Sequence, residues 1–180
     1  MARFSVRLAL LLILSLPAHA ALDLGEAAPD FTIPAALAGK VYKFSLSESL
    51  KKGPVVLYFF PAAFSEGCSA EAHLFAESIS QFDTFNASVV GVSGDDIQSL
   101  SKFSVQACQS KFPVASDESM TVIKSFDATM QTRPDFANRI TYVIAPDSKI
   151  VFSYISLNPV KHVEKTLAAL RGWAEAKAKK

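Results

Sequence analysis

The sequence predicts an α/β domain in which a central mixed β-sheet is flanked by helices on both faces. Two runs rich in β-branched and aromatic residues, 54–60 and 87–93, are typical of buried strands. A segment with apolar residues at helical spacing lies between them, and a hairpin signal follows in the second half of the chain. Strands that alternate with helices and end in a hairpin indicate one sheet with both faces covered.

The first half of the domain is expected to hold three strands and one helix. Alternating residues at 40–44 predict a short strand, and 54–60 predicts the buried central strand. The run 87–93 predicts the next buried strand. Between the last two, a helix is predicted from Ser69 to about Phe85, because four apolar residues recur there at helical spacing: Leu74, Phe75, Ile79 and Phe82.

A second helix is expected over 95–108, with Asp95 or Asp96 as its N-cap. Residues 112–117 then predict a short strand, and 119–128 a short helix.

The chain is expected to end in a hairpin and a long helix. The apolar runs 139–145 and 149–155 flank the turn sequence Pro-Asp-Ser. A last helix is predicted from near Asn158, with an apolar stripe formed by Val163, Leu167, Leu170 and Trp173. This order of strands and helices is thioredoxin-like.

The first twenty residues have the layout of a secretory signal peptide. Arg3 and Arg7 precede a ten-residue apolar run, and the segment ends in small residues at Ala18 and Ala20. An apolar run of this length is short for a membrane span, although a retained anchor is the alternative interpretation. We therefore expect cleavage after Ala20, export to a bacterial periplasm, and a single domain over residues 21–180.

Charge and composition argue against several classes of partner. Without the predicted signal peptide the chain has 16 basic and 17 acidic residues, a net charge near −1. Neither nucleic acid nor an anionic membrane surface is indicated. His73 and His162 are expected to be surface residues of helices, and no ligand partners stand at metal-like spacing. We expect no metal and no cofactor.

Cys68 is placed where a thiol can become a nucleophile. It stands at the start of the helix that follows the central strand, where free backbone N–H groups and the positive end of the helix dipole favour thiolate over thiol. Ser65, three residues earlier, can donate a hydrogen bond toward the sulfur or an oxygen bound to it. Pro61 shapes the turn and shields the site.

The negative charges of two nearby acids, Glu66 and Glu71, would disfavour a thiolate unless a positive charge compensates them. Arg139, which opens the segment 139–145, is our candidate for that cation.

Pro61, Ser65 and Cys68 match the active-site pattern of the peroxiredoxins, Pro-x-x-x-Thr/Ser-x-x-Cys, and the chain resembles that family over nearly all of residues 21–180. Glu71, three residues after the cysteine, makes it most similar to the Q-type (bacterioferritin-comigratory) subgroup. The resemblance implies that Cys68 reduces hydrogen peroxide and organic hydroperoxides and becomes a sulfenic acid, and that Pro61, Ser65 and Arg139 complete the peroxide pocket. It also implies an external dithiol reductant, thioredoxin- or glutaredoxin-like, and a monomer or weak homodimer.

The chain departs from the subgroup at the second cysteine. Many members carry a resolving cysteine five residues after the peroxidatic one, where this chain has His73. Others place a cysteine on the following helix, where Cys108 stands, and the resemblance then implies an intramolecular disulfide between Cys68 and Cys108. The active-site loop also lacks the lysine and aspartate that are common in the subgroup.

Two alternatives remain open. An exported protein with two cysteines often uses them for a structural disulfide, which would make the chain a non-catalytic redoxin-like module. A thioredoxin-like disulfide oxidoreductase would carry Cys-x-x-Cys, whereas Ser65 occupies the place of the first cysteine. We favour the peroxidase, and peroxide consumption separates it from both alternatives.

Overall fold

Seven strands form one mixed sheet in the order β2-β1-β5-β4-β3-β6-β7, in a computed structural model that describes residues 21–179. The predicted signal peptide lies outside the described residues. The strands are β1 (Thr32–Leu37), β2 (Lys40–Ser45), β3 (Val55–Phe59), β4 (Ser88–Ser93), β5 (Val114–Ser116), β6 (Ile140–Ile144) and β7 (Ile150–Ile155).

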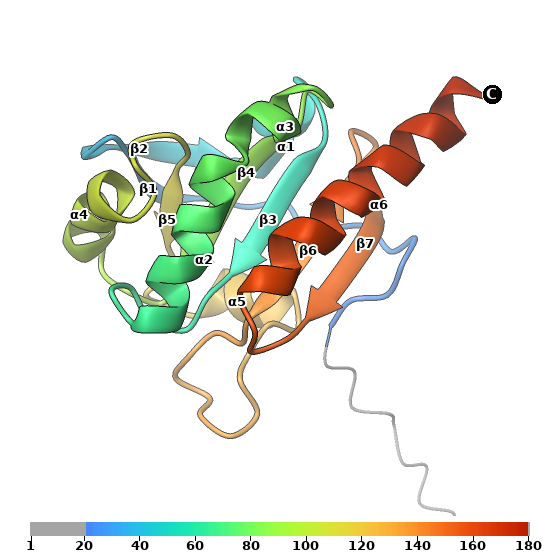
Figure 1. Cartoon of the computed structure of the whole chain (residues 1–180). Coiled ribbons are helices and arrows are strands. Elements are labelled where there is room, and N and C mark those ends of the chain that lie inside the picture. Colours follow the sequence, from blue (N-terminus) through green and yellow to red (C-terminus); the bar gives the residue numbers. More distant parts are fainter. Residues whose placement is uncertain (1–20, 180) are drawn as a thin grey trace, which may run out of the picture.

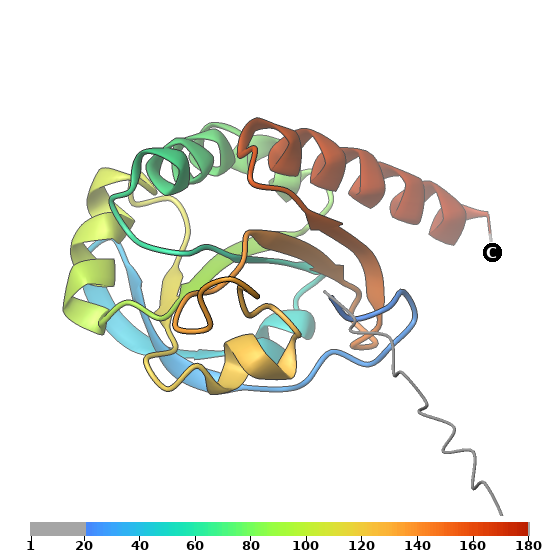
Figure 2. The same ribbon diagram turned by 90° about the horizontal axis from the view of Figure 1, so that it is seen from below.

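Helices cover both faces of the sheet, which confirms the predicted fold class (Figure 1). Figure 2 shows α2 and α6 together on one face, and α1 and α5 on the other. Among the described residues, no helix is both long enough and apolar enough to cross a membrane. The helices are α1 (Leu46–Leu50), α2 (Glu66–Glu77), α3 (Ile79–Asp83), α4 (Ile97–Gln106), α5 (Thr121–Ser125) and α6 (Val160–Ala178).

The central strand β3 divides the hydrophobic core in two. All five of its residues are buried, as expected of a strand covered on both faces. Val55, Leu57 and Phe59 face the core beneath α1 and α5, while Val56 and Tyr58 face the core beneath α2, α4 and α6.

Strand pairing brings the functional elements together at one end of the sheet. β3 runs parallel to β4 and antiparallel to β6, with Phe59 opposite Ile140. The end of β3, which leads into α2, therefore lies beside the start of β6. This pairing sets Arg139, the residue before β6, close to the first turn of α2.

The elements differ from the sequence prediction in four places, of which the first is helix α1, which was not predicted. The helix predicted from Ser69 to Phe85 is two helices, α2 and α3, because the backbone leaves helical geometry at Ser78. Strand β1 was not predicted, since its sequence has Pro34 and two alanines and so little β propensity. The helix predicted over 95–108 begins after the N-cap Asp96, as expected, but ends at Gln106.

Candidate active site

Cys68 lies in the first turn of α2 and is buried, with 1% of its surface exposed. The first hydrogen bond of the helix is donated by the Ser69 N–H to the Ser65 carbonyl, at 2.8 Å. The Cys68 N–H precedes that bond and belongs to the set that has no acceptor within the helix. The sulfur thus lies at the positive end of the helix dipole, as the sequence predicted.

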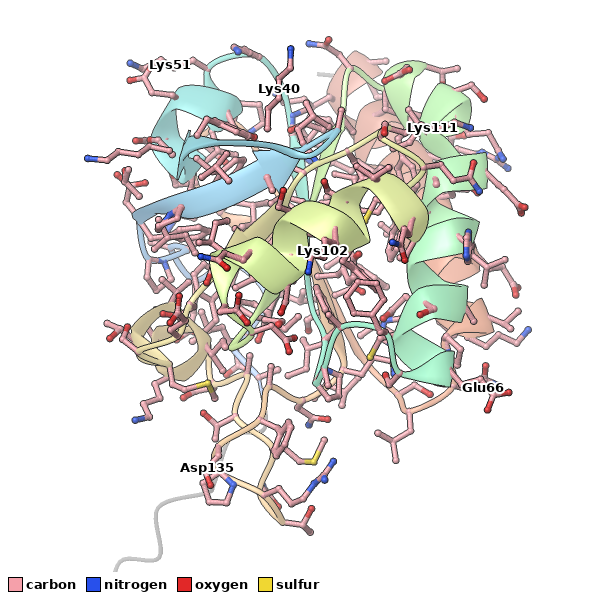
Figure 3. The ribbon with its side chains drawn as sticks, turned by 90° about the vertical axis from the view of Figure 1, so that its left-hand side faces the viewer. Lys40, Lys51, Glu66, Lys102, Lys111 and Asp135 are labelled. Carbon is pink, nitrogen blue, oxygen red and sulfur yellow. The ribbon has the colours of Figure 1, made fainter. Side chains whose placement is uncertain are left out.

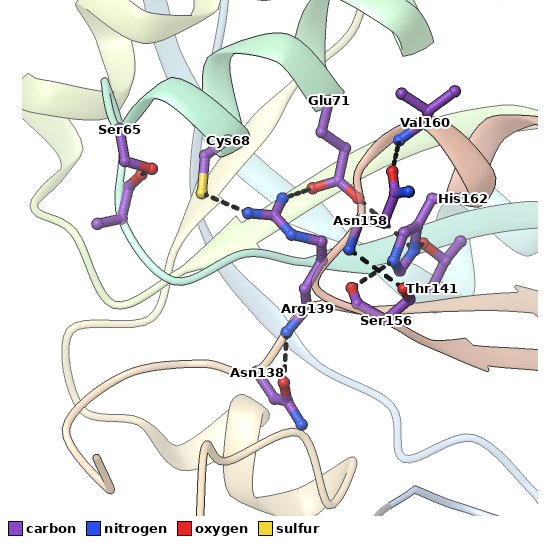
Figure 4. Close-up of polar contacts among 11 residues, drawn as sticks. Ser65, Cys68, Glu71, Asn138, Arg139, Thr141, Ser156, Asn158, Val160 and His162 are labelled. Atoms are coloured by element: carbon purple, nitrogen blue, oxygen red, sulfur yellow. Dashed lines mark hydrogen bonds and ion pairs between the residues drawn. The ribbon is translucent and has the colours of Figure 1, made fainter. Parts of the chain in front are cut away.

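Arg139 bridges Cys68 and Glu71 (Figure 4). Its Nη2 donates to the Cys68 Sγ at 3.4 Å, and its Nη1 forms an ion pair with the Glu71 Oε2. The Arg139 and Glu71 side chains are only 6% and 0% exposed. Glu66, by contrast, is exposed and points away from the body of the molecule (Figure 3). Arg139 therefore has the position expected of the predicted cation, and the acid with which it forms an ion pair is Glu71.

Gly67 makes room for this arginine. A Cβ atom at this position would lie 3.2 Å from the Arg139 Nη2, closer than such atoms normally approach. The absence of a side chain at residue 67 therefore leaves the guanidinium room beside the first turn of α2, and a methyl group there would require Arg139 to shift. Sequence reasoning missed Gly67, because the need for glycine comes from a residue 72 positions away.

Burial and charge oppose each other in the Arg139–Glu71 pair. Burial raises the pKa of Glu71 to about 7, although the Arg139 charge and hydrogen bond act to lower it. Burial acts to lower the pKa of Arg139, but the charges of Glu71 and Cys68 raise it overall. Arg139 is therefore a fixed cation, while Glu71 can take up a proton.

A pocket of about 640 Å³ brings together four of the five residues predicted for the site. Pro61, Ser65, Cys68 and Arg139 all line it, with Leu157 among the residues of its rim. Ser65 is placed differently from expectation, because its hydroxyl donates to the Ala62 carbonyl at 3.0 Å and not to the sulfur. Within residues 21–179, no cluster of three or more His, Cys, Asp or Glu side chains could hold a metal ion.

Residues 24–153 of the chain match the model of the AhpC/TSA family. The chain belongs to this family, and it is a peroxiredoxin. It is similar to peroxiredoxin Q of Oryza sativa subsp. japonica, with 34% identity over 148 residues that cover 82% of this chain but only 66% of that relative.

Two solved structures place this peroxiredoxin near the Q-type subgroup. Peroxidoxin BcpB from Mycobacterium tuberculosis is 32% identical, with a TM-score of 0.75 and coverage of 83% of this chain and 96% of that one. A mutant of PrxQ from Xylella fastidiosa is 26% identical, with a TM-score of 0.75 and coverage of 85% and 98%.

Cys108, the fifth residue predicted for the site, does not line the pocket of this peroxiredoxin. It lies two residues beyond the end of α4, so its expected position on that helix is wrong. Its N–H donates to the Phe103 carbonyl at 3.1 Å, in the turn that ends the helix. Both thiols are free and buried, and burial raises the pKa of Cys108 well above its ordinary value.

His162 is buried, and its expected surface position is wrong. Its Nδ1 lies 2.7 Å from the Thr141 Oγ1, and its Nε2 lies 2.9 Å from the Ser156 carbonyl oxygen. The sequence held a signal for this burial, because His162 is one helical turn before the buried Thr166 and two before Leu170.

Asp95 is a second polar residue of the site that sequence reasoning did not assign to it. Its Oδ2 accepts a hydrogen bond from the Ala63 N–H at 2.7 Å and another from the Ser93 hydroxyl. The carboxylate thus ties the loop between Pro61 and Ser65 to the end of β4.

Proposed function

We propose that the protein is a thiol peroxidase that reduces hydrogen peroxide and organic hydroperoxides, with Cys68 as the peroxidatic cysteine. The observation that carries this proposal is the Arg139 guanidinium, which contacts the Cys68 sulfur at 3.4 Å beside an open pocket at the start of α2. A cation and a helix N-terminus together favour a thiolate and the negative charge that develops on a peroxide oxygen. The signal-like residues 1–20 support the further proposal that it acts after export, in a periplasm.

In the first step, the Cys68 thiolate attacks one peroxide oxygen. An S–O bond forms and the O–O bond breaks, so that Cys68 becomes a sulfenic acid. The leaving hydroxide or alkoxide takes a proton from solvent and departs as water or alcohol. Arg139 and the Cys68 N–H are in position to stabilise the charge on the oxygens during this step.

The pocket supports organic hydroperoxides as substrates alongside hydrogen peroxide. Its volume of about 640 Å³ is large for hydrogen peroxide alone. Ile155 and Leu157 on its rim are 40% and 72% exposed, so they offer an apolar surface to an alkyl group.

In the second step, the Cys108 thiol condenses with the sulfenic acid. A disulfide forms, the S–O bond breaks, and the hydroxyl leaves with the thiol proton as water. Because Cys108 is buried outside the pocket, the turn after α4 and the start of α2 must open locally. Gln109 and Ser110 have left-handed backbone conformations, with φ of 51° and 60°, and such strain favours opening of this turn.

An external dithiol then completes the cycle. It returns two electrons and two protons to Cys68 and Cys108 and is itself oxidised to a disulfide. A thioredoxin- or glutaredoxin-like protein is the proposed reductant.

Consumption of hydrogen peroxide by the purified protein, with a small dithiol as reductant, tests this function. We expect many turnovers for the wild type and none above background for Cys68→Ser, which removes the nucleophile but keeps the size of the side chain. Cys108→Ser is the matched control, because it must still consume one equivalent of peroxide. Turnover by Cys68→Ser at the wild-type rate would show that the proposed chemistry is wrong.

A further inference from the structure

Each ring nitrogen of His162 lies within hydrogen-bond distance of a different polar group, and these two contacts determine which nitrogen carries the proton. The Ser156 carbonyl oxygen can only accept, so the Nε2 beside it carries the hydrogen. In the neutral ring, Nδ1 then has one lone pair that can accept a hydrogen bond, and the Thr141 hydroxyl at 2.7 Å is one of the groups that can donate to it. Three elements thus hold the ring in place: β6, the segment after β7, and the first turn of α6.

Glu71 turns its second oxygen toward this ring. Its Oε2 is occupied by Arg139, but its Oε1 is buried and has no hydrogen-bond partner among the described residues. The His162 Nδ1 lies 3.6 Å from that oxygen (Figure 4). This separation is slightly longer than a hydrogen bond. Because buried polar oxygens in proteins are usually hydrogen-bonded, a proton on Oε1 that replaces the Thr141 hydroxyl as the donor to Nδ1 would give Oε1 the partner that it lacks.

The charges of Arg139, Cys68 and Glu71 also indicate that one further proton is bound in this buried cluster. Arg139 supplies one positive charge, whereas a Cys68 thiolate and a Glu71 carboxylate together supply two negative charges. A buried net charge costs free energy, and one further proton on Glu71 or His162 would bring the sum to zero.

We propose that His162 is a positioning residue of the Cys68 site, which acts by sharing one proton with Glu71 and thereby holds Glu71 and Arg139 in place while Cys68 is a thiolate. This inference rests on the proposed peroxidase function. It assigns to His162 and Thr141 a role beyond the residues that contact Cys68 directly.

The directions of the pKa shifts agree with this geometry. Burial raises the pKa of Glu71 to about 7 and lowers the pKa of His162 to about 4, so the proton resides mainly on the carboxyl group at neutral pH. The hydrogen bond to Ser156 opposes the lowering of the His162 pKa, and the Arg139 charge contributes to it.

Two tyrosines complete the titratable surroundings of the pair. Burial raises the pKa of Tyr58, on β3, well above 10. Tyr154, on β7, packs edge-to-face with His162 at a ring-centre distance of 4.9 Å, and the Lys165 Nζ lies 5.4 Å from the centre of the Tyr154 ring.

The pH dependence of Cys68 oxidation provides the first test. Because the raised Glu71 pKa means that the proton is present below about pH 7 and lost above it, the rate constant of the reduced wild type with hydrogen peroxide should fall above pH 7. This is opposite to the rise that ionisation of an ordinary thiol gives. In Glu71→Gln the amide cannot lose that proton, so the fall should be absent from its profile. A fall that persists in Glu71→Gln would overturn the proposal.

Additivity of two substitutions provides the second test. His162→Phe keeps a flat ring without nitrogens and should slow Cys68 oxidation at pH 6 by roughly tenfold, less than the ~10²-fold cost of moving a reacting group by 1 Å. In the Glu71→Gln background, the same substitution should change the rate by less than about twofold, because its effect passes through Glu71. Equal effects in both backgrounds would overturn the proposal. The exposed His73, replaced by Phe, is the matched control and should leave the rate unchanged.

A nitrogen-15 spectrum of labelled histidines covers the case in which His162→Phe does not fold. In the wild type, the His162 ring should show the Nε2–H tautomer, and its Nδ1 signal should move near pH 7 although the ring stays neutral. That movement should be absent from Glu71→Gln, and its presence there would contradict proton sharing. This readout needs no peroxidase activity, so a failure of the proposed function is distinguishable from a failure of the Glu71–His162 pair.

Discussion

The position of the Arg139 guanidinium depends on three neighbours, Cys68, Glu71 and Gly67. Its Nη2 needs the Cys68 sulfur, its Nη1 needs the Glu71 carboxylate, and the guanidinium needs the space left by Gly67. The planar fork of an arginine can satisfy two acceptors at once, which the single ammonium of a lysine cannot do in the same geometry. A lysine at position 139 would therefore keep the positive charge of Arg139 but lose the shape that reaches both acceptors.

We predict that Arg139→Lys loses most of the rate even though it keeps the positive charge. The expected fall in the rate constant of Cys68 oxidation is on the order of 10²-fold, the cost of removing one preorganised electrostatic donor. Arg133, an exposed arginine of the same pocket whose guanidinium lies over the Phe136 ring, is the control position. A rate for Arg139→Lys equal to that of Arg133→Lys would mean that charge alone matters.

Gly67→Ala should separate stability from activity. Within a helix, alanine is favoured over glycine by up to about 1 kcal/mol, so the free energy of unfolding should rise or stay level. The new methyl group would press on the Arg139 Nη2, and Cys68 oxidation should slow by roughly tenfold. Stopped-flow oxidation and denaturant unfolding of the same variant measure the two quantities. An unchanged rate would show that the Arg139 side chain can shift away from the new methyl group without slowing Cys68 oxidation.

At the scale of elements, the two cysteines belong to segments of different character. Cys68 lies in the first turn of α2, held by Arg139 and by the loop that Asp95 fixes. Cys108 lies in the turn after α4, and Lys111 of this turn donates to the Ala76 carbonyl of α2 at 3.2 Å. The segment that we propose to open therefore contacts the helix that we propose to unwind.

Cys108→Ser tests whether Cys68 and Cys108 form a disulfide during turnover. We expect one normal oxidation of Cys68, followed by no cycling with a dithiol protein and by gradual over-oxidation of Cys68. Peroxide consumption over one and over many equivalents, with mass spectrometry of the product, measures both effects.

The stability of the wild type distinguishes this role from that of a structural staple. Reduction of a structural disulfide would lower the free energy of unfolding by about 2–5 kcal/mol. Because both thiols are free in the folded structure, we expect the reduced protein to be at least as stable as the oxidised one. A large loss of stability on reduction, together with normal cycling of Cys108→Ser, would make Cys108 a staple.

At the scale of the whole molecule, the sheet order determines which residues meet. The antiparallel pairing of β3 with β6 brings Arg139 to the first turn of α2, and the packing of α6 on α2 brings His162 to Glu71. Residues far apart in sequence thus converge at one end of the sheet, around a cysteine that a local motif already marks.

Local patterns predicted the part of this arrangement that local physics determines. The buried strand β3, the N-cap Asp96 and the position of Cys68 at a helix start follow from residues within one turn of one another. Gly67 and His162 could not be assigned in the same way, because their roles depend on contacts across the fold. Cys108 was misplaced by two residues, since nothing in its neighbours marks the end of α4.

Mapping of the sulfenic acid by mass spectrometry tests most directly whether Cys68 is the residue that reacts with peroxide. Reduced Cys108→Ser protein would receive one equivalent of hydrogen peroxide together with dimedone, which traps sulfenic acids. We predict a dimedone adduct on the peptide that contains Cys68, formed in step with the loss of peroxide and absent from Cys68→Ser. Peroxide consumption without an adduct on Cys68 would contradict the proposed mechanism.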